Sequence, residues 1–423
     1  MASTKLNLMT AKCNNFSETA RRLYGDSVDL EQAAARFWDL GQAHESMFGQ
    51  SAYRFFSSPG RIELCGNHTD HQHGKVLAAS INLDTLAAVS PCEDSRIVVK
   101  SGAYPIIDVS LHSLDKQDAE VGTSLALIKG VARYFVDHGY RVGGFVATMT
   151  SNVARGSGVS SSASFECCVA EILNVLYNDG AVSAVEKAKA SQWAESEYFG
   201  KPCGLLDQCA IALGGVSYID FADPASPAVE KLDFPFDATI MLVNSGGDHT
   251  KLTDCYTAIR TEMQEVAHLL GGDVLRDVQA DNTLFARCIQ AGLPGRAALR
   301  AHHFFAEEAR VDAAVEAIKH GTPEVFYDQL NASGLSSAYY LQNTCVPGDD
   351  RQPINVAVEF LRSLDAECCR VHGGGFAGTV LGIFHSSVAR EAYRSIVDVY
   401  GKDNVFEVSI RPDGAVATDV IIG

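Results

Sequence analysis

The segment Gly156-Ser-Gly-Val-Ser-Ser-Ser-Ala163 constrains this chain more than any other feature. It is a glycine- and serine-rich turn that runs directly into an apolar stretch of helical character, residues 164–177. Glycine lets a backbone approach a ligand without an obstructing Cβ, and the first turn of a helix offers unpaired N–H groups at its positive end. Such a turn suits phosphate, although alone it can equally be a simple helix cap. It is not a Walker loop, because no Gly-Lys-Ser/Thr follows the glycines.

Two further segments flank this loop at long range. They are Ser58-Pro-Gly-Arg-Ile-Glu-Leu-Cys-Gly-Asn-His-Thr-Asp-His-Gln-His-Gly74 and Val371-His-Gly-Gly-Gly-Phe-Ala-Gly-Thr379. Three such segments, in this order and at this spacing, resemble the GHMP family of small-molecule kinases and, within it, the galactokinases. The resemblance extends from about residue 53 to the C-terminus. It implies a kinase that uses ATP and Mg2+, with the nucleotide bound by Gly156, Ser157, Gly158, Ser160, Ser161 and Ser162.

The composition fits a globular enzyme that handles small molecules. With 423 residues the chain is long for one hydrophobic core, so two domains are expected. The formal net charge of −18 argues against nucleic acid and anionic membranes as partners. The 12 cysteines lack metal-type CxxC spacing and indicate buried thiols in a reducing cytoplasm. Because neither a signal peptide nor a membrane span is evident, we expect a cytoplasmic protein, as a monomer or weak dimer.

Alternating and helical periodicities predict a mixed α+β fold. Strands are expected at residues 61–65, 83–90, 96–100 and 144–150, with a further strand ending at 243–245 and others on both sides of the glycine-rich segment 371–379. Helices are expected at 18–24, 30–44, 123–138, 182–199, 256–269, 282–291, 298–320 and 323–334. A turn-rich segment at 221–227 suggests a domain boundary near Phe234. We expect a helical N-terminal extension (1–50), an N-terminal domain with the phosphate loop (51–233) and a C-terminal domain (234–423). The resemblance implies the two-domain GHMP architecture, with the active site in the cleft between the domains.

Asp207, in Lys201-Pro-Cys-Gly-Leu-Leu-Asp-Gln208, is the expected catalytic residue. We place it in a turn after a helix, among apolar neighbours whose desolvation raises a carboxylate pKa unless a cation opposes it. Arg61 of the Pro-Gly-Arg turn is the candidate cation. The resemblance implies that Asp207 accepts the proton of the sugar C1 hydroxyl as that hydroxyl attacks the γ-phosphate, while Arg61 keeps it ionised. The plain alternative is a helix-capping Asp207 and an Arg61 in a surface ion pair.

The resemblance also supplies two magnesium ligands, a serine from the phosphate loop and a glutamate from the helix before the catalytic aspartate. By position these are Ser162 and Glu195. Hard oxygen ligands suit Mg2+, which usually keeps several waters. Without the resemblance, Glu195 would be interpreted as a solvated carboxylate on a helix surface. Glu197, two residues further, would point to a different face of that helix.

Sugar recognition is where the chain departs from the family. The galactokinase signature reads Gly-Glu-His-Thr-Asp-Tyr-Asn-Gly-Gly, whereas residues 66–74 read Gly-Asn-His-Thr-Asp-His-Gln-His-Gly. Asn67 replaces the glutamate that meets the C6 hydroxyl, and we expect its amide to face that group. The resemblance implies further substrate contacts from His68, Asp70, Gly204 and Tyr256, the last closing over the C4 side of the sugar. The glycines at 373–378 are expected to place backbone N–H groups against these loops.

The substitution at position 67 leaves two sugar classes open. A glutamate would repel a C6 carboxylate, whereas an asparagine would tolerate it. The Asp-His-Gln triplet is also similar to that of plant galacturonate 1-kinases. We therefore expect galactose first and a uronate (galacturonate or glucuronate) as the alternative. A non-catalytic galactose and ATP sensor fits less well, because the Ser-Ser-Ser-Ala-Ser segment at 160–164 is intact and Asp207 and Arg61 remain. The His-Thr-Asp and Leu-Asp-Gln segments argue for a sugar over mevalonate or homoserine.

Overall fold

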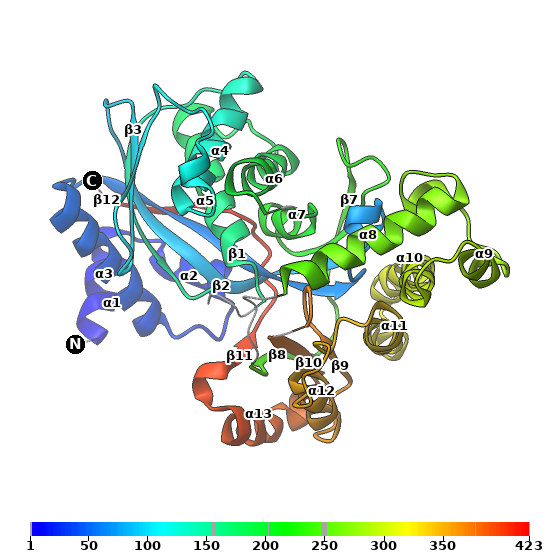
Figure 1. Ribbon diagram of the computed structural model, residues 1–423. Coiled ribbons are helices and arrows are strands. Elements are labelled where there is room, and N and C mark those ends of the chain that lie inside the picture. The colour runs from blue at the N-terminus through cyan, green and yellow to red at the C-terminus, as the bar shows by residue number, and fades with distance from the viewer. Residues whose placement is uncertain (1, 154–157, 202, 247–251, 377, 423) are drawn as a thin grey trace.

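The computed structural model describes residues 2–153, 158–201, 203–246, 252–376 and 378–422 (Figure 1). Within these residues the larger sheet has eight strands in the order β12-β1-β2-β5-β3-β4, and β6 pairs with both β2 and β7. Among the described strands, only β3 and β5 pair in parallel. The strands are β1 Tyr53–Cys65, β2 Lys75–Pro91, β3 Arg96–Ser101, β4 Ile107–Ser110, β5 Phe145–Ser151, β6 Val216–Asp220, β7 Ala228–Leu232 and β12 Val416–Ile422.

A second sheet among the described residues has four antiparallel strands in the order β11-β8-β10-β9. Its strands are β8 Thr239–Asn244, β9 Cys368–Val371, β10 Thr379–Phe384 and β11 Val405–Val408. The glycine-rich third motif forms the connection between β9 and β10. This connection lies at one end of the second sheet, where it contacts the first sheet.

The helices surround both sheets. They are α1 Ala2–Lys12, α2 Phe16–Tyr24, α3 Leu30–Phe48, α4 Ser124–Asp137, α5 Ser161–Tyr177, α6 Ala184–Trp193, α7 Leu206–Leu213, α8 Thr253–Leu270, α9 Leu284–Gln290, α10 Gly295–His320, α11 Pro323–Ser336, α12 Pro353–Arg362 and α13 Ser386–Tyr400. Two π-helical turns follow helices directly, η3 Ala194–Phe199 after α6 and η6 Ser337–Leu341 after α11. A short 3-10 turn, η1 Asp70–Gln72, lies in the first motif. None of the described helices is long and apolar enough to cross a membrane.

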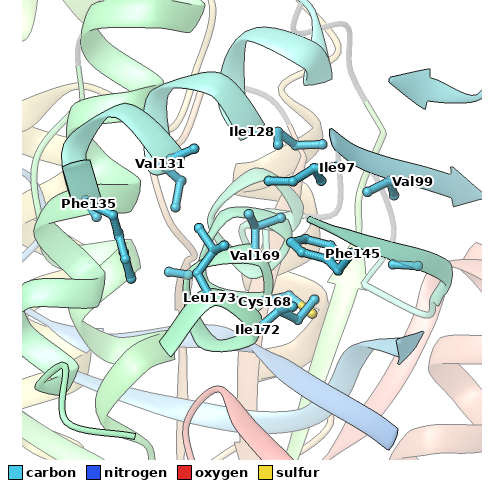
Figure 2. Packing of buried hydrophobic residues seen from close by; sticks show 14 of the residues in the cluster. Ile97, Val99, Ile128, Val131, Phe135, Phe145, Cys168, Val169, Ile172 and Leu173 are labelled. Atoms are coloured by element: carbon cyan, nitrogen blue, oxygen red, sulfur yellow. The ribbon is translucent and has the colours of Figure 1, made fainter. Parts of the chain in front are cut away.

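The two faces of the larger sheet are covered by different helices. Helices α4, α5 and α6 pack their apolar side chains on β3, β5 and neighbouring strands, and Figure 2 shows Phe135, Phe145 and Leu173 within this cluster. Helices α1–α3 cover the opposite face, where Phe16 packs on Phe37 and Phe37 packs on Phe55 of β1. Each face is apolar because side chains alternate along a strand and both sides are buried. The N-terminal helices thus form a buried core of their own with the larger sheet.

Strand β1 connects the two sheets to one another. Ile62 and Leu64 are fully buried in a cluster with α10, α11, β8 and β10. Arg61 and Glu63 alternate with them along the strand and therefore point to the opposite side. That alternation sends the arginine of the Pro-Gly-Arg turn toward α7 and the phosphate loop.

Most expected elements are present, and several were missed. The predicted strands and helices all overlap observed ones, whereas α1, α7, α12, α13, β4, β6, β7, β11 and β12 had no counterpart in the prediction. The proposed boundary near Phe234 falls between β7 of the first sheet and β8 of the second. The last strand, β12, returns to pair with β1, so the end of the proposed C-terminal domain joins the first sheet. The chain therefore ends on the side where it begins (Figure 1).

Candidate active site

Asp207 and Arg61 form the centre of the site. Arg61, on β1, donates from Nε to Asp207 Oδ1 at 2.9 Å, and its second terminal nitrogen lies 2.8 Å from the same oxygen. The prediction that Asp207 lies in a turn is wrong, because it occupies the first turn of α7. A carboxylate is stabilised at that end of a helix. The Asp207 side chain retains 37% exposure, so a ligand can reach it, whereas Arg61 retains 6%.

The electrostatic surroundings keep Asp207 ionised. Burial pushes its pKa upward, but the charge of Arg61, the hydrogen bond from Ser160 and the charge of Lys201 outweigh it, so the pKa lies below its ordinary value. Ser160 Oγ donates to Oδ2, the oxygen that Arg61 leaves free. Arg61 also donates to the carbonyl of Gly158. The arginine thus connects the carboxylate to the phosphate loop.

Asp70 lies close to this pair. Its Oδ1 accepts the backbone N–H of His71 at 2.9 Å, and its Oδ2 lies 3.5 Å from the N–H of Leu206. Burial, followed by the negative charge of Asp207, raises the pKa of Asp70 to about 6. Gly204 is needed for this approach, because a Cβ at that position would lie 1.6 Å from Asp70 Oδ2. The structure therefore brings Asp70, Gly204 and Asp207 together.

Asn67 does not face the site. Its side chain is fully buried, and Nδ2 donates to Glu63 Oε1 and to the carbonyl of Gly373, both at 2.8 Å. Its Oδ1 accepts from Asn343 Nδ2 at 2.8 Å and from Ser337 Oγ at 3.2 Å. Because an amide has two donors and two acceptor positions, none remains for a sugar hydroxyl. The expectation that Asn67 contacts the C6 group is contradicted by this geometry.

His68 and Tyr256 join the first and third motifs. His68 Nε2 lies 3.0 Å from the carbonyl of Gly374, and the Tyr256 hydroxyl donates to the carbonyl of Gly375 at 2.8 Å. The two rings stack with centroids 6.5 Å apart. A Cβ on Gly374 would lie 2.7 Å from the Tyr256 ring, which explains why this segment is glycine-rich. Burial lowers the pKa of His68 to about 4, so its imidazole is neutral near pH 7.

The phosphate loop leads into α5 as the sequence suggested, but the helix starts earlier than expected. It begins at Ser161 and not near residue 164, so Ser161 and Ser162 lie in its first turn, whose N–H groups have no helical partner. Ser160 precedes it with φ +63°, and its side chain makes no capping bond. Gly158 also has a positive φ, +71°. The predicted nucleotide ligands Gly156 and Ser157 lie outside the described residues.

The two predicted magnesium ligands are adjacent. Ser162 Oγ lies 3.0 Å from Glu195 Oε1. Glu195 is on the π-helical turn η3, a wider turn of the kind often found at functional sites, and its side chain is 4% exposed, whereas Glu197 is exposed. A hydroxyl and a carboxylate are hard oxygen donors, and their small number matches an ion that takes further ligands from water and phosphate. The donor set therefore fits Mg2+.

The sequence did not predict the side chains that contact the expected site residues Glu195 and Asn67. Lys201 Nζ lies 2.9 Å from Glu195 Oε1, and Gln208 donates to Oε2 at 2.8 Å. Glu63 is buried beside Asn67 and pairs with Arg370 at 3.2 Å. The alternation of side chains along β1 could have identified Glu63, because residues 61 and 63 share a face. Lys201 and Gln208 belong to the same motif as Asp207, but no periodic pattern in that motif indicates where their side chains point.

Comparisons with known proteins agree with this geometry. Residues 42–91 match the family model described as the galactokinase galactose-binding signature, and residues 126–215 match the GHMP kinases N terminal domain. A galactokinase from Pyrococcus furiosus is 26% identical over 343 residues, which cover 81% of this chain and 92% of that protein.

The chain is thus similar to the GHMP kinases and, among them, to the galactokinases. Among solved structures, Lactococcus lactis galactokinase complexed with galactose has the same fold, with a TM-score of 0.78 at 24% identity over 90% of this chain and 99% of that one. Mevalonate kinase from Methanococcus jannaschii has a TM-score of 0.61 at 14% identity over 85% and 98% of the two chains. These findings confirm the expected family, the α+β GHMP fold and the class of enzyme, a sugar kinase that uses ATP. The roles of individual residues stay predictions.

Proposed function

We propose that this GHMP kinase transfers the γ-phosphoryl group of ATP to the C1 hydroxyl of galactose. The observation that carries the proposal is the partly exposed carboxylate of Asp207, held by Arg61 beside Asp70. The galactose-binding signature and the fold shared with a galactose-bound galactokinase support galactose as the sugar.

In this proposal, Asp207 orients the C1 hydroxyl and takes its proton. A carboxylate with a depressed pKa is a weak base, which suits phosphoryl transfer, because its loose transition state requires alignment and charge stabilisation more than early proton removal. Arg61 contributes positive charge next to the reacting oxygen. Asp70, with Gly204 leaving space beside it, accepts hydrogen bonds from further sugar hydroxyls, while His68 and Tyr256 line the third motif.

The nucleotide phosphates would lie at the start of α5. Its first-turn N–H groups, including those of Ser161 and Ser162, lack a side-chain cap and carry the positive end of the helix dipole. Ser162 and Glu195 would hold Mg2+, which when bound would neutralise phosphate charge. Arg61, through its contact with the Gly158 carbonyl, ties this loop to Asp207.

The alternative of a uronate substrate loses its structural support. It rested on Asn67 facing the C6 group, and that amide is fully committed to Glu63, Gly373, Ser337 and Asn343. A sensor that binds without turnover is not favoured either, because Asp207 is bonded to Arg61 and Ser160, the arrangement that the proposed phosphoryl transfer uses.

ATP consumption tests the proposal directly. The purified protein is assayed with Mg2+ and galactose, galacturonate, glucuronate, glucose or N-acetylgalactosamine, beside Asp207→Asn as the matched inactive control. We expect galactose to be turned over fastest and Asp207→Asn to lose activity. Faster turnover of a uronate, or no sugar-dependent ATP consumption, would refute the proposed function.

A further inference from the structure

Ser160 has a backbone conformation that calls for an explanation. It has φ +63° and ψ +61°, a left-handed conformation that costs a residue other than glycine about 1 kcal/mol or more. Such positions persist only where the surrounding structure holds them, and they cluster at functional sites. The serine lies between the buried Val159 and the first residue of α5, so its side chain is directed by the turn that starts the helix.

The hydroxyl of Ser160 does not cap the helix that follows it, which is the usual role of a serine at this position. A serine preceding a helix typically accepts a hydrogen bond from an N–H of the first turn, yet no such bond is present here. Instead, Ser160 Oγ donates to Asp207 Oδ2, across 47 residues of sequence. The first-turn N–H groups of α5 therefore remain available to an anion, while the hydroxyl is committed to the carboxylate.

Three hydroxyls of this segment contact different parts of the chain. Ser160 bonds to Asp207, Ser162 lies 3.0 Å from Glu195, and Ser164 donates to the carbonyl of Ser58 at 2.8 Å. Asp207 in turn has a different partner on each oxygen, Arg61 on Oδ1 and Ser160 on Oδ2. Since Arg61 contacts only one oxygen, rotation of the carboxylate about its Cβ–Cγ bond is restricted by the serine.

We propose that Ser160 is a positioning residue for Asp207, and that its hydroxyl orients the carboxylate toward the sugar instead of binding the nucleotide. The inference rests on the proposed function for the role of Asp207. In this proposal the backbone N–H groups at the start of α5 bind the phosphates, and the side chain of Ser160 positions the carboxylate that contacts the sugar. It also explains the strained backbone, because this conformation places Oγ against Oδ2.

Several charged and titratable groups face Asp207, and the Ser160 contribution must be separated from theirs. They come from β1, the first-motif loop, α5 and the segment before α7, and are Arg61, Glu63, His68, Asp70, Glu166 and Lys201. Burial raises the pKa of Asp207, and Arg61, Ser160 and Lys201 together lower it below the ordinary value. Removing only the hydroxyl is therefore expected to raise this pKa while every charge stays in place.

The test compares Ser160→Gly with Ser160→Ala. Glycine adopts the φ of this position without strain, so Ser160→Gly removes the hydroxyl and spares the backbone, whereas Ser160→Ala removes it and keeps the strain. A hydrogen bond to a charged group contributes about 1.5–3 kcal/mol, and we expect kcat with galactose to fall about tenfold or more in both variants. We expect KM for ATP, and the dissociation constant of ADP measured by calorimetry, to stay near wild type.

A second readout does not depend on turnover. With 13C at the aspartate carboxyl carbons, NMR titration follows the Asp207 resonance, identified by its loss in Asp207→Asn. The pKa of Asp207 should be higher in Ser160→Gly than in wild type. If this pKa is unchanged, or if both variants weaken nucleotide binding and keep kcat, the inference is overturned. If wild type shows no activity on galactose while the NMR shift is present, it is the proposed function that fails.

Discussion

Two polar clusters, one around Asp207 and one around Asn67, use their side chains in opposite ways. Around Asp207, the carboxylate is held from one side by Arg61 and Ser160 and remains 37% exposed on the other. Around Asn67, every polar atom of the amide is bonded and the side chain is fully buried. The Asp207 carboxylate keeps hydrogen-bonding capacity for a ligand, whereas the Asn67 amide uses all of its own within the fold. Exposure and unused hydrogen-bonding capacity therefore distinguish a chemical role from an architectural one.

The largest expected effect is on the Asp207 side of this comparison. Asp207→Asn keeps an acceptor for Arg61 but removes the negative charge and the proton acceptor, so kcat with galactose should fall about 10²- to 10⁴-fold. The free energy of unfolding should change by less than about 1 kcal/mol, because the site is partly exposed. Coupled assays of ADP release and chemical denaturation measure both quantities. Near-normal turnover would contradict the role of Asp207.

Gly204 offers a steric test of the same cluster. In Gly204→Ala the new Cβ would lie 1.6 Å from Asp70 Oδ2, so Asp70 must move, and KM for galactose should rise about tenfold or more. Gly295→Ala is the matched control, since nothing lies within 4 Å of its Cβ. Steady-state kinetics over galactose concentration distinguish the two. Equal KM values in the two variants would show that Asp70 does not need this space.

Substitution of Asn67 should lower the free energy of unfolding and leave the sugar preference unchanged. Asn67→Asp replaces two donors with acceptors facing Glu63 Oε1 and the Gly373 carbonyl, so we expect a loss of about 3 kcal/mol in the free energy of unfolding. The rate ratio between galactose and galacturonate should stay as in wild type. Asn14→Asp, at an exposed site, serves as the control in denaturant titrations. A stable Asn67→Asp variant with altered sugar preference would reverse our interpretation of this cluster.

The smallest effect is a pH dependence of stability from Glu63. Burial, only partly opposed by the charges of Arg370 and Arg61, raises its pKa to about 7 from an ordinary 4.5. The folded state then binds the proton more tightly than the unfolded state. The resulting stabilisation is complete below pH 4.5 and is lost as pH rises through 7. Glu63→Gln should therefore remove on the order of 2–3 kcal/mol of this pH-dependent change, as measured by denaturation between pH 5 and 8.

How far the sequence predicts the site depends on whether a residue lies on a regular element. Arg61 and Asp207 meet as expected, as do Ser162 and Glu195, because the family motifs imply those pairs. Asn67 was misplaced because its loop breaks the alternation of β1, with Gly66 at φ +95° and His68 at φ +58°. A sequence position in such a turn does not reveal which way its side chain points.

The missed elements have similar physical causes. Helix α7 has only eight residues and is apolar nearly throughout, so it shows no helical periodicity. Strand β12 pairs with β1, more than 350 residues away along the chain, and no local pattern encodes that partner. The long amphipathic α10 and the buried α5 were found from sequence because their patterns extend over many turns.

A crystal structure with galactose and a non-hydrolysable ATP analogue would test the central contrast most directly. The account predicts that Asp207 lies within about 3 Å of the C1 hydroxyl, with Ser160 still bonded to Oδ2, and that Asn67 keeps its bonds to Glu63 and Gly373. An Asn67 amide turned toward the sugar C6 group, or an Asp207 remote from C1, would contradict it.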